Sequence, residues 1–425
     1  MKKKETVAVI GLGYVGLPLA VRTQERGYNV IGLELDKSKI KLINKGISPI
    51  EDDFLHKNLP LFPIKATSDK KEIKKADIVL ICVPTPVDAQ YNPNLAPVRS
   101  ACEMAATNLK SGTLVVLEST VNPGVSEEVV RPIFEEHGHK IGKDVFIAHC
   151  PERINPGDPK WNVTNIPRVV GAFTKKGLKK AQNFYESIID GKIKPMQHIR
   201  EAEACKVVEN SFRDINIAFV NELAKSFDKL DIDVKDVIDG ASTKPFAFMA
   251  HYPSRGIGGH CIPVDPYYLI ERAKRAGFDH KFLKTSRAIN NSMPKYTVEL
   301  LQDKLNDVKM PLNGTSIGIA GIAYKANVDD DRESPFYNIV SALQKHKAKI
   351  HSFDPYLKKK STSKSLNDLL EKSEAIILMT NHRQFEVING ELLKKHNIKV
   401  IVDGMNCLNK KDIEDHGIIY KGIGR

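Results

Sequence analysis

The sequence has only six cysteines in 425 residues, and no two of them show the CxxC spacing of zinc sites and redox motifs. This scarcity argues against a disulfide framework, and we expect five of the six to be buried as small apolar residues. No apolar run approaches the roughly 20 residues of a membrane-spanning helix, and the lysine-rich start does not read as a signal peptide. The composition predicts a soluble, cytoplasmic protein with no membrane partner.

Acidic residues are also few, since the chain has 52 of them against 64 lysines and arginines, which gives a net charge of +12. The basic residues are spread in short clusters without a nucleic-acid-binding motif, so we expect no nucleic acid partner. A basic surface suits an anionic substrate such as a sugar nucleotide, although a solvated lysine-rich face explains it equally simply. The length predicts two or three domains.

A glycine-rich turn follows the first apolar run, residues 6–10, and precedes a helical pattern through Arg26. Strand, glycine turn and helix in this order are typical of dinucleotide binding. In that motif the first glycine makes the turn, the second lets the backbone approach the pyrophosphate, and the third packs the helix on the strand. The predicted cofactor-binding residues of the turn are Gly11, Gly13, Tyr14, Val15 and Gly16.

Cofactor choice depends on Glu34, which ends a second strand pattern, residues 29–35. A carboxylate there binds the adenosine ribose hydroxyls and repels a 2′-phosphate, so NAD is favoured over NADP. Lys37 and Lys39 lie close enough to keep NADP open as an alternative.

Further strand patterns at 77–83, 113–118 and 145–149 alternate with helices, which predicts a parallel, doubly wound sheet. Ligands bind at the carboxyl ends of such strands. The loops there contain Pro84, Thr85, Ser119, Thr120, Cys150 and Glu152. Turn formation alone explains the two threonines equally well, Glu152 either holds a water or substrate hydroxyl or is merely solvated, and Cys150 is expected to pack.

One long helix is predicted over residues 200–230, and its apolar positions recur at helical spacing. They are Ala204, Val208, Ile215, Phe219, Leu223 and Phe227. A polar stripe on the same helix holds Glu203, Lys206, Asn210 and Arg213. Such a stripe faces either solvent or a site, and we favour a site.

A third segment repeats the strand and helix alternation, with strands at 315–321, 348–353, 375–380 and 398–402. It lacks the full glycine fingerprint, so we expect a ligand other than a dinucleotide. The predicted fold is α/β, with two Rossmann-like, doubly wound parallel-sheet domains joined by a central helical domain with a long helix. The expected boundaries are 1–198, 199–308 and 309–425.

The turn Gly258-Gly259-His260-Cys261 sets a single cysteine four residues before Asp265. A buried, inert cysteine is the default interpretation. The flanking glycines, the nearby carboxylate and a lysine on the polar helix favour a covalent nucleophile instead. A metal site with His251 is not expected, because no carboxylate cluster or second cysteine completes the ligand set.

Together these motifs resemble the UDP-glucose/GDP-mannose dehydrogenase family over nearly the whole chain. They are Gly11 to Gly16, Glu118-Ser119-Thr120, Pro151-Glu152-Arg153, Ala202 to Lys206 with Asn210 and Asn221-Glu222, Gly258 to Cys261, and Tyr324-Lys325 with Asp331 to Pro335.

The resemblance implies oxidation of a sugar C6 alcohol to a carboxylate with two NAD molecules in succession. Cys261 would add to the aldehyde intermediate, with Lys206 and Asn210 stabilising the oxyanion. Water activated near Glu152, Thr120 or Asp265 would then hydrolyse the thioester. These six are the predicted catalytic residues.

The resemblance also implies that the third domain binds the uridine diphosphate, that Arg332 reaches the cofactor or a facing site, and that the central helix forms a homodimer or higher homo-oligomer. The implied substrate-binding residues are Glu152, Arg153, Lys206, Asn210, Arg213, Arg255, Gly258 and Lys325.

Val264 stands where UDP-glucose enzymes usually carry lysine, and His260 precedes the cysteine, so the chain looks like the branch acting on UDP-N-acetylhexosamines, UDP-GlcNAc or UDP-ManNAc. We expect the uronate to feed polysaccharide biosynthesis. Three alternatives stay open: a UDP-glucose 6-dehydrogenase, a single-step β-hydroxyacid-type dehydrogenase, and a non-catalytic NAD-binding protein.

Overall fold

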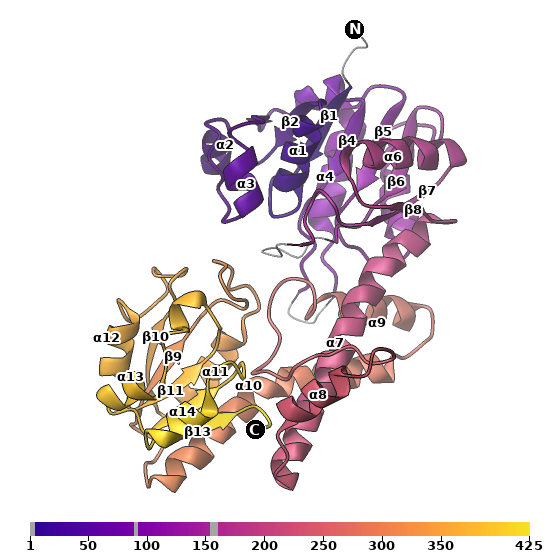
Figure 1. The fold of residues 1–425 in the computed structure, drawn as a ribbon. Coiled ribbons are helices and arrows are strands. Elements are labelled where there is room, and N and C mark those ends of the chain that lie inside the picture. The colour runs from indigo at the N-terminus through magenta and orange to yellow at the C-terminus, as the bar shows by residue number, and fades with distance from the viewer. Residues whose placement is uncertain (1–4, 89–91, 154–159) are drawn as a thin grey trace. The chain divides into compact units, whose positions relative to one another are not determined.

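The computed structural model describes residues 5–88, 92–153 and 160–425, coloured along the chain in Figure 1. The chain divides into two compact units, residues 1–209 with 267–279, and residues 210–266 with 280–425. Among the described residues, no helix combines the length and apolar character that crossing a membrane requires. The units are described one at a time.

The first unit is built on an eight-stranded sheet of order β3-β2-β1-β4-β5-β6-β7-β8. Its strands are β1 (Thr6–Ile10), β2 (Asn29–Leu33), β3 (Lys65–Thr67), β4 (Ile78–Ile81), β5 (Thr113–Leu117), β6 (Val145–His149), β7 (Arg168–Ala172) and β8 (Ile193–Pro195). All neighbours pair in parallel except β6 and β7, which run antiparallel. The strands predicted for this part of the chain are therefore present, and the sheet also contains the antiparallel strand β7, which was not predicted.

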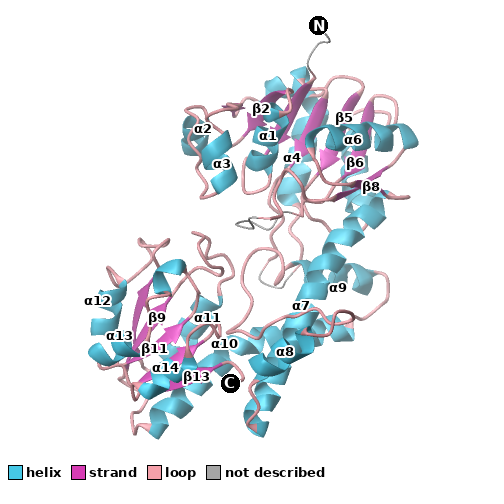
Figure 2. Ribbon diagram, in the orientation of Figure 1, coloured by secondary structure: helices cyan, strands magenta, loops and turns pink. Residues whose placement is uncertain are grey.

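Helices cover both faces of this sheet (Figure 2). They are α1 (Gly16–Glu25), α2 (Lys37–Ile43), α3 (Asp53–Asn58), α4 (Ala96–Asn108), α5 (Arg131–Glu136) and α6 (Lys175–Ile188), with short turns η1 (Lys70–Lys75) and η2 (Ser126–Val130). Because side chains alternate along a strand, Val7 and Val9 enter one apolar core while Ala8 and Ile10 enter the other. Burial on both faces explains the uninterrupted apolar strands.

The second unit contains a five-stranded, all-parallel sheet of order β10-β9-β11-β12-β13. Its strands are β9 (Ser316–Ala320), β10 (Lys349–Phe353), β11 (Ala375–Leu378), β12 (Val400–Asp403) and β13 (Ile419–Gly422). The accompanying helices are α11 (Pro335–Lys345), α12 (Leu366–Glu371), α13 (Gly390–Lys395) and α14 (Lys410–Asp415), with the turn η3 (Arg383–Phe385). The predicted fold class of two Rossmann-like sheets around a helical middle is confirmed.

The helical middle consists of α7 (Ile199–Leu230), α8 (Val234–Ser242), α9 (Asp265–Arg275) and α10 (Lys281–Asp307). The apolar residues of α7 are less buried than their spacing suggested, since Val208 is 53% exposed and Phe219 55%. Phe212 is exposed as well. These three apolar side chains of α7 are therefore exposed to solvent.

A buried polar network joins α7 to α10 within the second unit. Asp214 Oδ1 accepts hydrogen bonds from Arg287 Nη1 at 2.5 Å and Asn290 Nδ2 at 2.8 Å. Asn290 Oδ1 accepts from Asn221 Nδ2 at 2.9 Å, and Asn221 Oδ1 accepts from the Ser254 amide at 2.9 Å. The network therefore ties the segment before the cysteine turn to two helices.

The cysteines correct one expectation. Cys82, Cys102 and Cys150 are buried as predicted, but Cys205 is half-buried and Cys407 is exposed. Cys407 directly follows the carboxyl-end turn of β12, and Cys205 lies on α7. The expectation that all cysteines other than Cys261 are buried is therefore wrong for Cys205 and Cys407.

A fully buried ion pair lies in the first unit, where Arg168 Nη1 meets Glu118 Oε2 at 2.7 Å. Tyr185 donates its hydroxyl to the other carboxylate oxygen. Because β7 runs against β6, its first residue, Arg168, lies at the edge where the parallel strands end. The reversed strand thus brings a cation to the carboxyl ends of β5 and β6.

We predict that Arg168→Met lowers the free energy of unfolding by about 3–5 kcal/mol, because it leaves the Glu118 carboxylate buried without its cation. Glu118→Gln combined with Arg168→Met should recover part of that loss. Chemical denaturation measures both. The control is Arg275→Met, which removes an exposed partner of Glu271 and should change stability by less than about 0.5 kcal/mol. Equal effects of Arg168→Met and Arg275→Met would contradict the assignment.

Candidate active site

The glycine turn between β1 and α1 has three different environments. Gly11 has φ +92°, and a Cβ there would lie 2.7 Å from the Cys82 carbonyl oxygen. A Cβ on Gly16 would lie 1.9 Å from the Gly11 carbonyl oxygen. A Cβ on Gly13 would meet no atom within 4 Å, so packing does not demand glycine there. An open position beside the amino end of α1 suits a pyrophosphate. Tyr14 and Val15 complete the turn, and both are half-buried.

Glu34 follows β2 and lies against this turn. Its Oε2 accepts from the Leu12 amide at 3.2 Å, and its Oε1 accepts from the amides of Leu35 and Asp36 at 2.8 and 3.1 Å. The carboxylate is therefore held at the end of β2, where a ribose-binding acid is expected.

The loops after β4 and β5 are tied together. Ser119 Oγ donates to the Val83 carbonyl at 2.7 Å, and Tyr268 donates its hydroxyl to the Thr85 carbonyl. Pro84 lies between those two loop residues, and Thr120 is half-buried beside Ser119. The structure brings the predicted rim residues of the first unit onto one edge.

Glu203 does not share the role suggested for its polar stripe. Its two oxygens accept from the Gly124 amide at 2.6 Å and the Ser126 amide at 2.8 Å, and its side chain is buried. Burial raises the pKa of Glu203 to about 6, although the Gly124 hydrogen bond opposes it. Glu203 therefore anchors the loop that follows Thr120, as a structural residue.

Glu152 and Lys206 are both buried in the first unit. Burial raises the pKa of Glu152 to about 7, and the charges of Lys206 and then Arg168 oppose that rise. Glu152 Oε1 has no hydrogen-bond partner among the described residues. Such a carboxyl group is balanced between its acid and base forms near neutral pH. Arg153 instead pairs with Glu209 at 2.6 Å and donates to the Pro167 carbonyl.

The cysteine turn of the second unit is shaped by Tyr324. A Cβ on Gly258 would lie 2.6 Å from the Tyr324 Cβ, and one on Gly259, where φ is +89°, would lie 2.8 Å from the tyrosine ring. The Gly259 amide donates to the Arg332 carbonyl at 3.0 Å. These close approaches explain the two glycines and leave the Cys261 side chain exposed.

Asp265 and Asn210 lie next to this turn. The Asp265 amide donates to the Cys261 carbonyl at 2.8 Å, and Asn210 Nδ2 donates to Asp265 Oδ2 at 2.5 Å. Both side chains are buried, whereas Arg213, one turn further along α7, is exposed. The structure therefore brings Asn210, Cys261 and Asp265 together within one unit.

Three further predicted residues lie around Tyr324. Arg255 is buried and donates from Nη2 to the Tyr324 carbonyl at 2.9 Å, and burial lowers its pKa to about 10. Arg332 pairs with Asp330 at 2.6 Å, and Lys325 is half-buried next to Tyr324. Here Arg255 supports the turn, and its contact with a diphosphate stays a prediction.

Sequence reasoning missed Arg168, Tyr185 and the packing role of Tyr324. A charged residue opening the apolar run Arg168–Ala172 was the available signal for the first. In the described ranges, no group of three or more His, Cys, Asp or Glu side chains could hold a metal ion.

Family models match three consecutive segments of the chain. All three describe the UDP-glucose/GDP-mannose dehydrogenase family: its NAD binding domain matches residues 5–189, its central domain residues 200–292, and its UDP binding domain residues 318–410.

Full-length relatives agree with these matches. The chain is 34% identical to a UDP-N-acetyl-D-mannosamine dehydrogenase of Pyrococcus horikoshii, covering 99% of each chain. It is 34% identical to a UDP-N-acetyl-D-glucosamine 6-dehydrogenase of Salmonella typhi, covering 91% of this chain and 92% of the relative. A solved structure of UDP-D-ManNAc dehydrogenase from Pyrococcus horikoshii aligns with a TM-score of 0.92 and 33% identity, covering 99% of each.

The glycine turn yields a prediction that separates cofactor binding from folding. Gly13→Ala should leave the thermal midpoint within about 2 °C of the wild type but weaken NAD binding about tenfold or more, because its methyl group enters the open position beside α1. Gly16→Ala should lower the midpoint instead, since its methyl group collides with the Gly11 carbonyl. NAD titration and thermal unfolding of both variants check this. Unchanged NAD affinity in Gly13→Ala would refute it.

Proposed function

The chain belongs to the UDP-glucose/GDP-mannose dehydrogenase family, and we propose that it oxidises the C6 alcohol of a UDP-N-acetylhexosamine to the uronate in two steps. It is an NAD-dependent oxidoreductase of UDP-sugars. The observation that carries the finer proposal is the exposed Cys261 in a tight glycine turn, with Asp265 and Asn210 beside it.

In the proposed mechanism Cys261 acts as the nucleophile. NAD, when bound along the glycine turn, supplies the hydride acceptor for each oxidation. The thiolate adds to the C6 aldehyde to give a thiohemiacetal, whose oxyanion is stabilised by Lys206 and Asn210. Loss of hydride leaves a thioester. Hydroxide from water then adds to its carbonyl carbon, the thiolate leaves, and the carboxylate is released.

Glu152 is the best-supported group for activating that water, ahead of Thr120 and Asp265. Its carboxyl group is buried with an unpartnered oxygen and a pKa of about 7. Asp265 already accepts from Asn210, which suits a positioning role. We assign Asp265 to orienting Asn210 and the cysteine turn.

The remaining assignments follow the predicted division into residues 1–198, 199–308 and 309–425. The residues that would contact the cofactor are Gly11, Gly13, Tyr14, Val15, Gly16, Glu34, Pro84, Thr85, Ser119, Thr120 and Arg332. Arg153, Arg213, Arg255, Gly258 and Lys325 would contact the UDP-sugar. The exposed face of α7 at Val208, Phe212 and Phe219 would pair with a second copy, since burying these side chains is favourable.

The N-acetylhexosamine assignment rests on two supports. His260 and Val264 depart from the UDP-glucose pattern, and the relatives named above are described as acting on UDP-N-acetylmannosamine and UDP-N-acetylglucosamine. UDP-glucose is the alternative substrate. A protein with no catalytic role is disfavoured, because every residue that the chemistry needs is present.

We predict that Glu152→Gln abolishes the pH dependence of thioester hydrolysis. A base works only when deprotonated, so in the wild type this step should accelerate as the pH rises through about 7, the pKa of Glu152, and then level off. The glutamine variant should be slower by about 10²–10⁴-fold at high pH and accumulate the Cys261 thioester. Rapid-quench mass spectrometry over roughly pH 5.5–9, a range that brackets the pKa of Glu152, measures both the rate and the thioester. A variant with the wild-type pH profile would assign the base elsewhere.

Substrate and stoichiometry form the central test. We expect two NADH for each UDP-N-acetylhexosamine consumed, and UDP-glucose turned over about ten- to a hundredfold less efficiently, because polar groups that bind the N-acetyl group are left unpaired. A UDP-sugar panel with NADH and uronate quantified decides both points. Cys261→Ala is the control and should form no uronate while retaining NAD affinity. One NADH per sugar would contradict the two-step mechanism, and equal efficiency with UDP-glucose would contradict the sugar assignment.

A further inference from the structure

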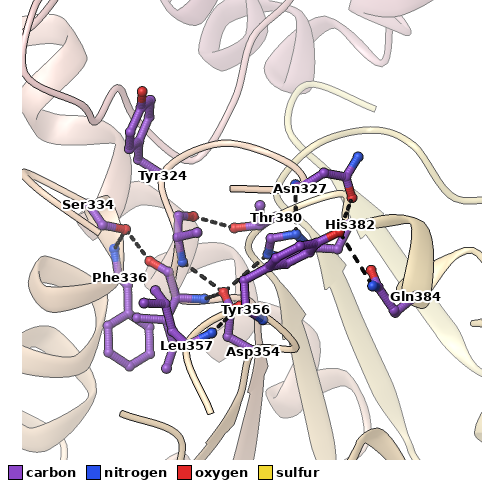
Figure 3. Close-up of polar contacts among 12 residues, drawn as sticks. Tyr324, Asn327, Ser334, Phe336, Asp354, Tyr356, Leu357, Thr380, His382 and Gln384 are labelled. Atoms are coloured by element: carbon purple, nitrogen blue, oxygen red, sulfur yellow. Dashed lines mark hydrogen bonds and ion pairs between the residues drawn. The ribbon is translucent and has the colours of Figure 1, made fainter. Parts of the chain in front are cut away.

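A buried pair in the second unit, Asp354 and His382, has no role in the mechanism above. Asp354 follows β10 and His382 follows β11, so both lie at the carboxyl ends of the second sheet. Both side chains are wholly buried, and His382 Nε2 lies 3.1 Å from Asp354 Oδ2 (Figure 3). A buried pair at the ligand-binding edge of a doubly wound sheet needs an explanation.

Asp354 holds the turn that follows β9. Its Oδ2 accepts from the amides of Ile322 at 2.7 Å and Ala323 at 2.9 Å, in addition to His382. Its Oδ1 accepts from the amides of Tyr356 and Leu357 at 2.8 and 3.1 Å. Burial raises the pKa of Asp354, but the hydrogen bonds of His382, Ala323 and Ile322 outweigh it and the pKa falls to about 2. The carboxylate is therefore permanently ionised near neutral pH.

His382 holds the other end of the same segment. Its Nδ1 lies 2.9 Å from the Asn327 amide nitrogen, which can only donate, so Nδ1 accepts and the ring proton lies on Nε2, toward Asp354. Asn327 has φ +59°, a left-handed conformation that asparagine adopts more readily than most residues. The Tyr356 ring packs against the imidazole with centroids 5.0 Å apart. The imidazole is thus fixed in place and in tautomer.

Residues 322–327, the segment held at both ends, carry Tyr324 and Lys325. Thr380 Oγ1 donates to the Ala323 carbonyl at 2.6 Å and Arg255 to the Tyr324 carbonyl, so the middle of the segment is also fixed. Tyr324 packs on the backbone of Gly258 and Gly259 in the Cys261 turn. A shift of the segment would therefore move both the proposed substrate lysine and the support of the nucleophile.

We infer that Asp354 and His382 are positioning residues that act through segment 322–327, with His382 fixing its far end through the Asn327 amide. The inference rests on the proposed function for the roles of Lys325 and Cys261. Neither residue needs to touch the substrate, because each acts through the backbone that carries residues which do. Substrate affinity should therefore depend on a histidine whose side chain is wholly buried.

Two substitutions separate the two contacts of His382. His382→Asn keeps an acceptor at the level of Nδ1, facing Asn327, whereas His382→Gln keeps a donor at the level of Nε2, facing Asp354. His382→Ala removes both. Gln384→Ala is the matched control, because Gln384 touches the Tyr356 hydroxyl at 3.4 Å and is exposed.

The experiment uses the full-length chain and measures UDP affinity by calorimetry, KM for the UDP-sugar, KM for NAD, and the thermal midpoint. His382→Ala and His382→Gln should weaken UDP binding and raise the sugar KM by about tenfold or more, while His382→Asn stays within about threefold of the wild type. KM for NAD and all values for Gln384→Ala should stay within about twofold. A purely structural role would instead lower the midpoint without separating the two KM values.

Several outcomes would overturn the inference. These are a sugar KM for His382→Ala within twofold of the wild type, equal rises in both KM values, or a His382→Gln variant that outperforms His382→Asn. If His382→Ala does not fold, the comparison of His382→Asn with His382→Gln still tests the inference. A wild-type chain that binds UDP but oxidises no UDP-sugar would reject the proposed function and leave the calorimetric comparison valid. A wild-type chain that binds no UDP would reject both.

Discussion

The second unit depends on the requirement that a buried carboxylate be paired. Burial raises the pKa of Asp214, and the charge of Arg287 opposes that rise. The pairing fixes α10 against α7, and through Asn290 and Asn221 the same network reaches the Ser254 amide, seven residues before Cys261. A buried charge without its partner is strongly destabilising, so the helices have little freedom to slide. This network therefore holds the chain just before the cysteine turn, and Tyr324 packs against Gly258 and Gly259 within the turn.

An acidic residue follows β2 in the first sheet and β10 in the second, but Glu34 and Asp354 have different surroundings. Glu34 takes one amide of the glycine turn, from Leu12, and lies at a half-exposed edge. Asp354 is one methylene shorter and wholly buried, and it binds the amides of both Ile322 and Ala323. Those two amides are already occupied, so the turn after β9 does not offer them to a pyrophosphate. In the second sheet, the amides of the turn after β9 are therefore used to hold Asp354 in place.

Most of the fold could be predicted from the sequence, whereas the hydrogen-bond partners of individual polar side chains could not. Strand and helix patterns predicted both sheets, the long helix and the edge on which the first unit's rim residues gather, because alternation and apolar runs report burial directly. Spacing could not report which polar group meets which backbone amide. Glu203 was grouped with Lys206 by position but is taken up by the Gly124 and Ser126 amides. His382 lies in no pattern, because its partners, Asp354 and Asn327, are distant in sequence. Apolar spacing on α7 likewise could not distinguish buried positions from the exposed positions Val208, Phe212 and Phe219.

The placement of the cysteines has a consequence for chemical labelling. Burial raises the thiol pKa of Cys82, Cys102 and Cys150 and shields them from reagents, and partial burial also raises that of Cys205. Cys407 is exposed at the surface, but desolvation of its thiol and the nearby charge of Asp403 raise its pKa to about 12. Thiolates react far faster than thiols. A limiting amount of a bulky alkylating reagent should therefore discriminate among six cysteines by protonation state as much as by access. The surroundings of these five thiols therefore favour their protonated, slowly reacting form near neutral pH.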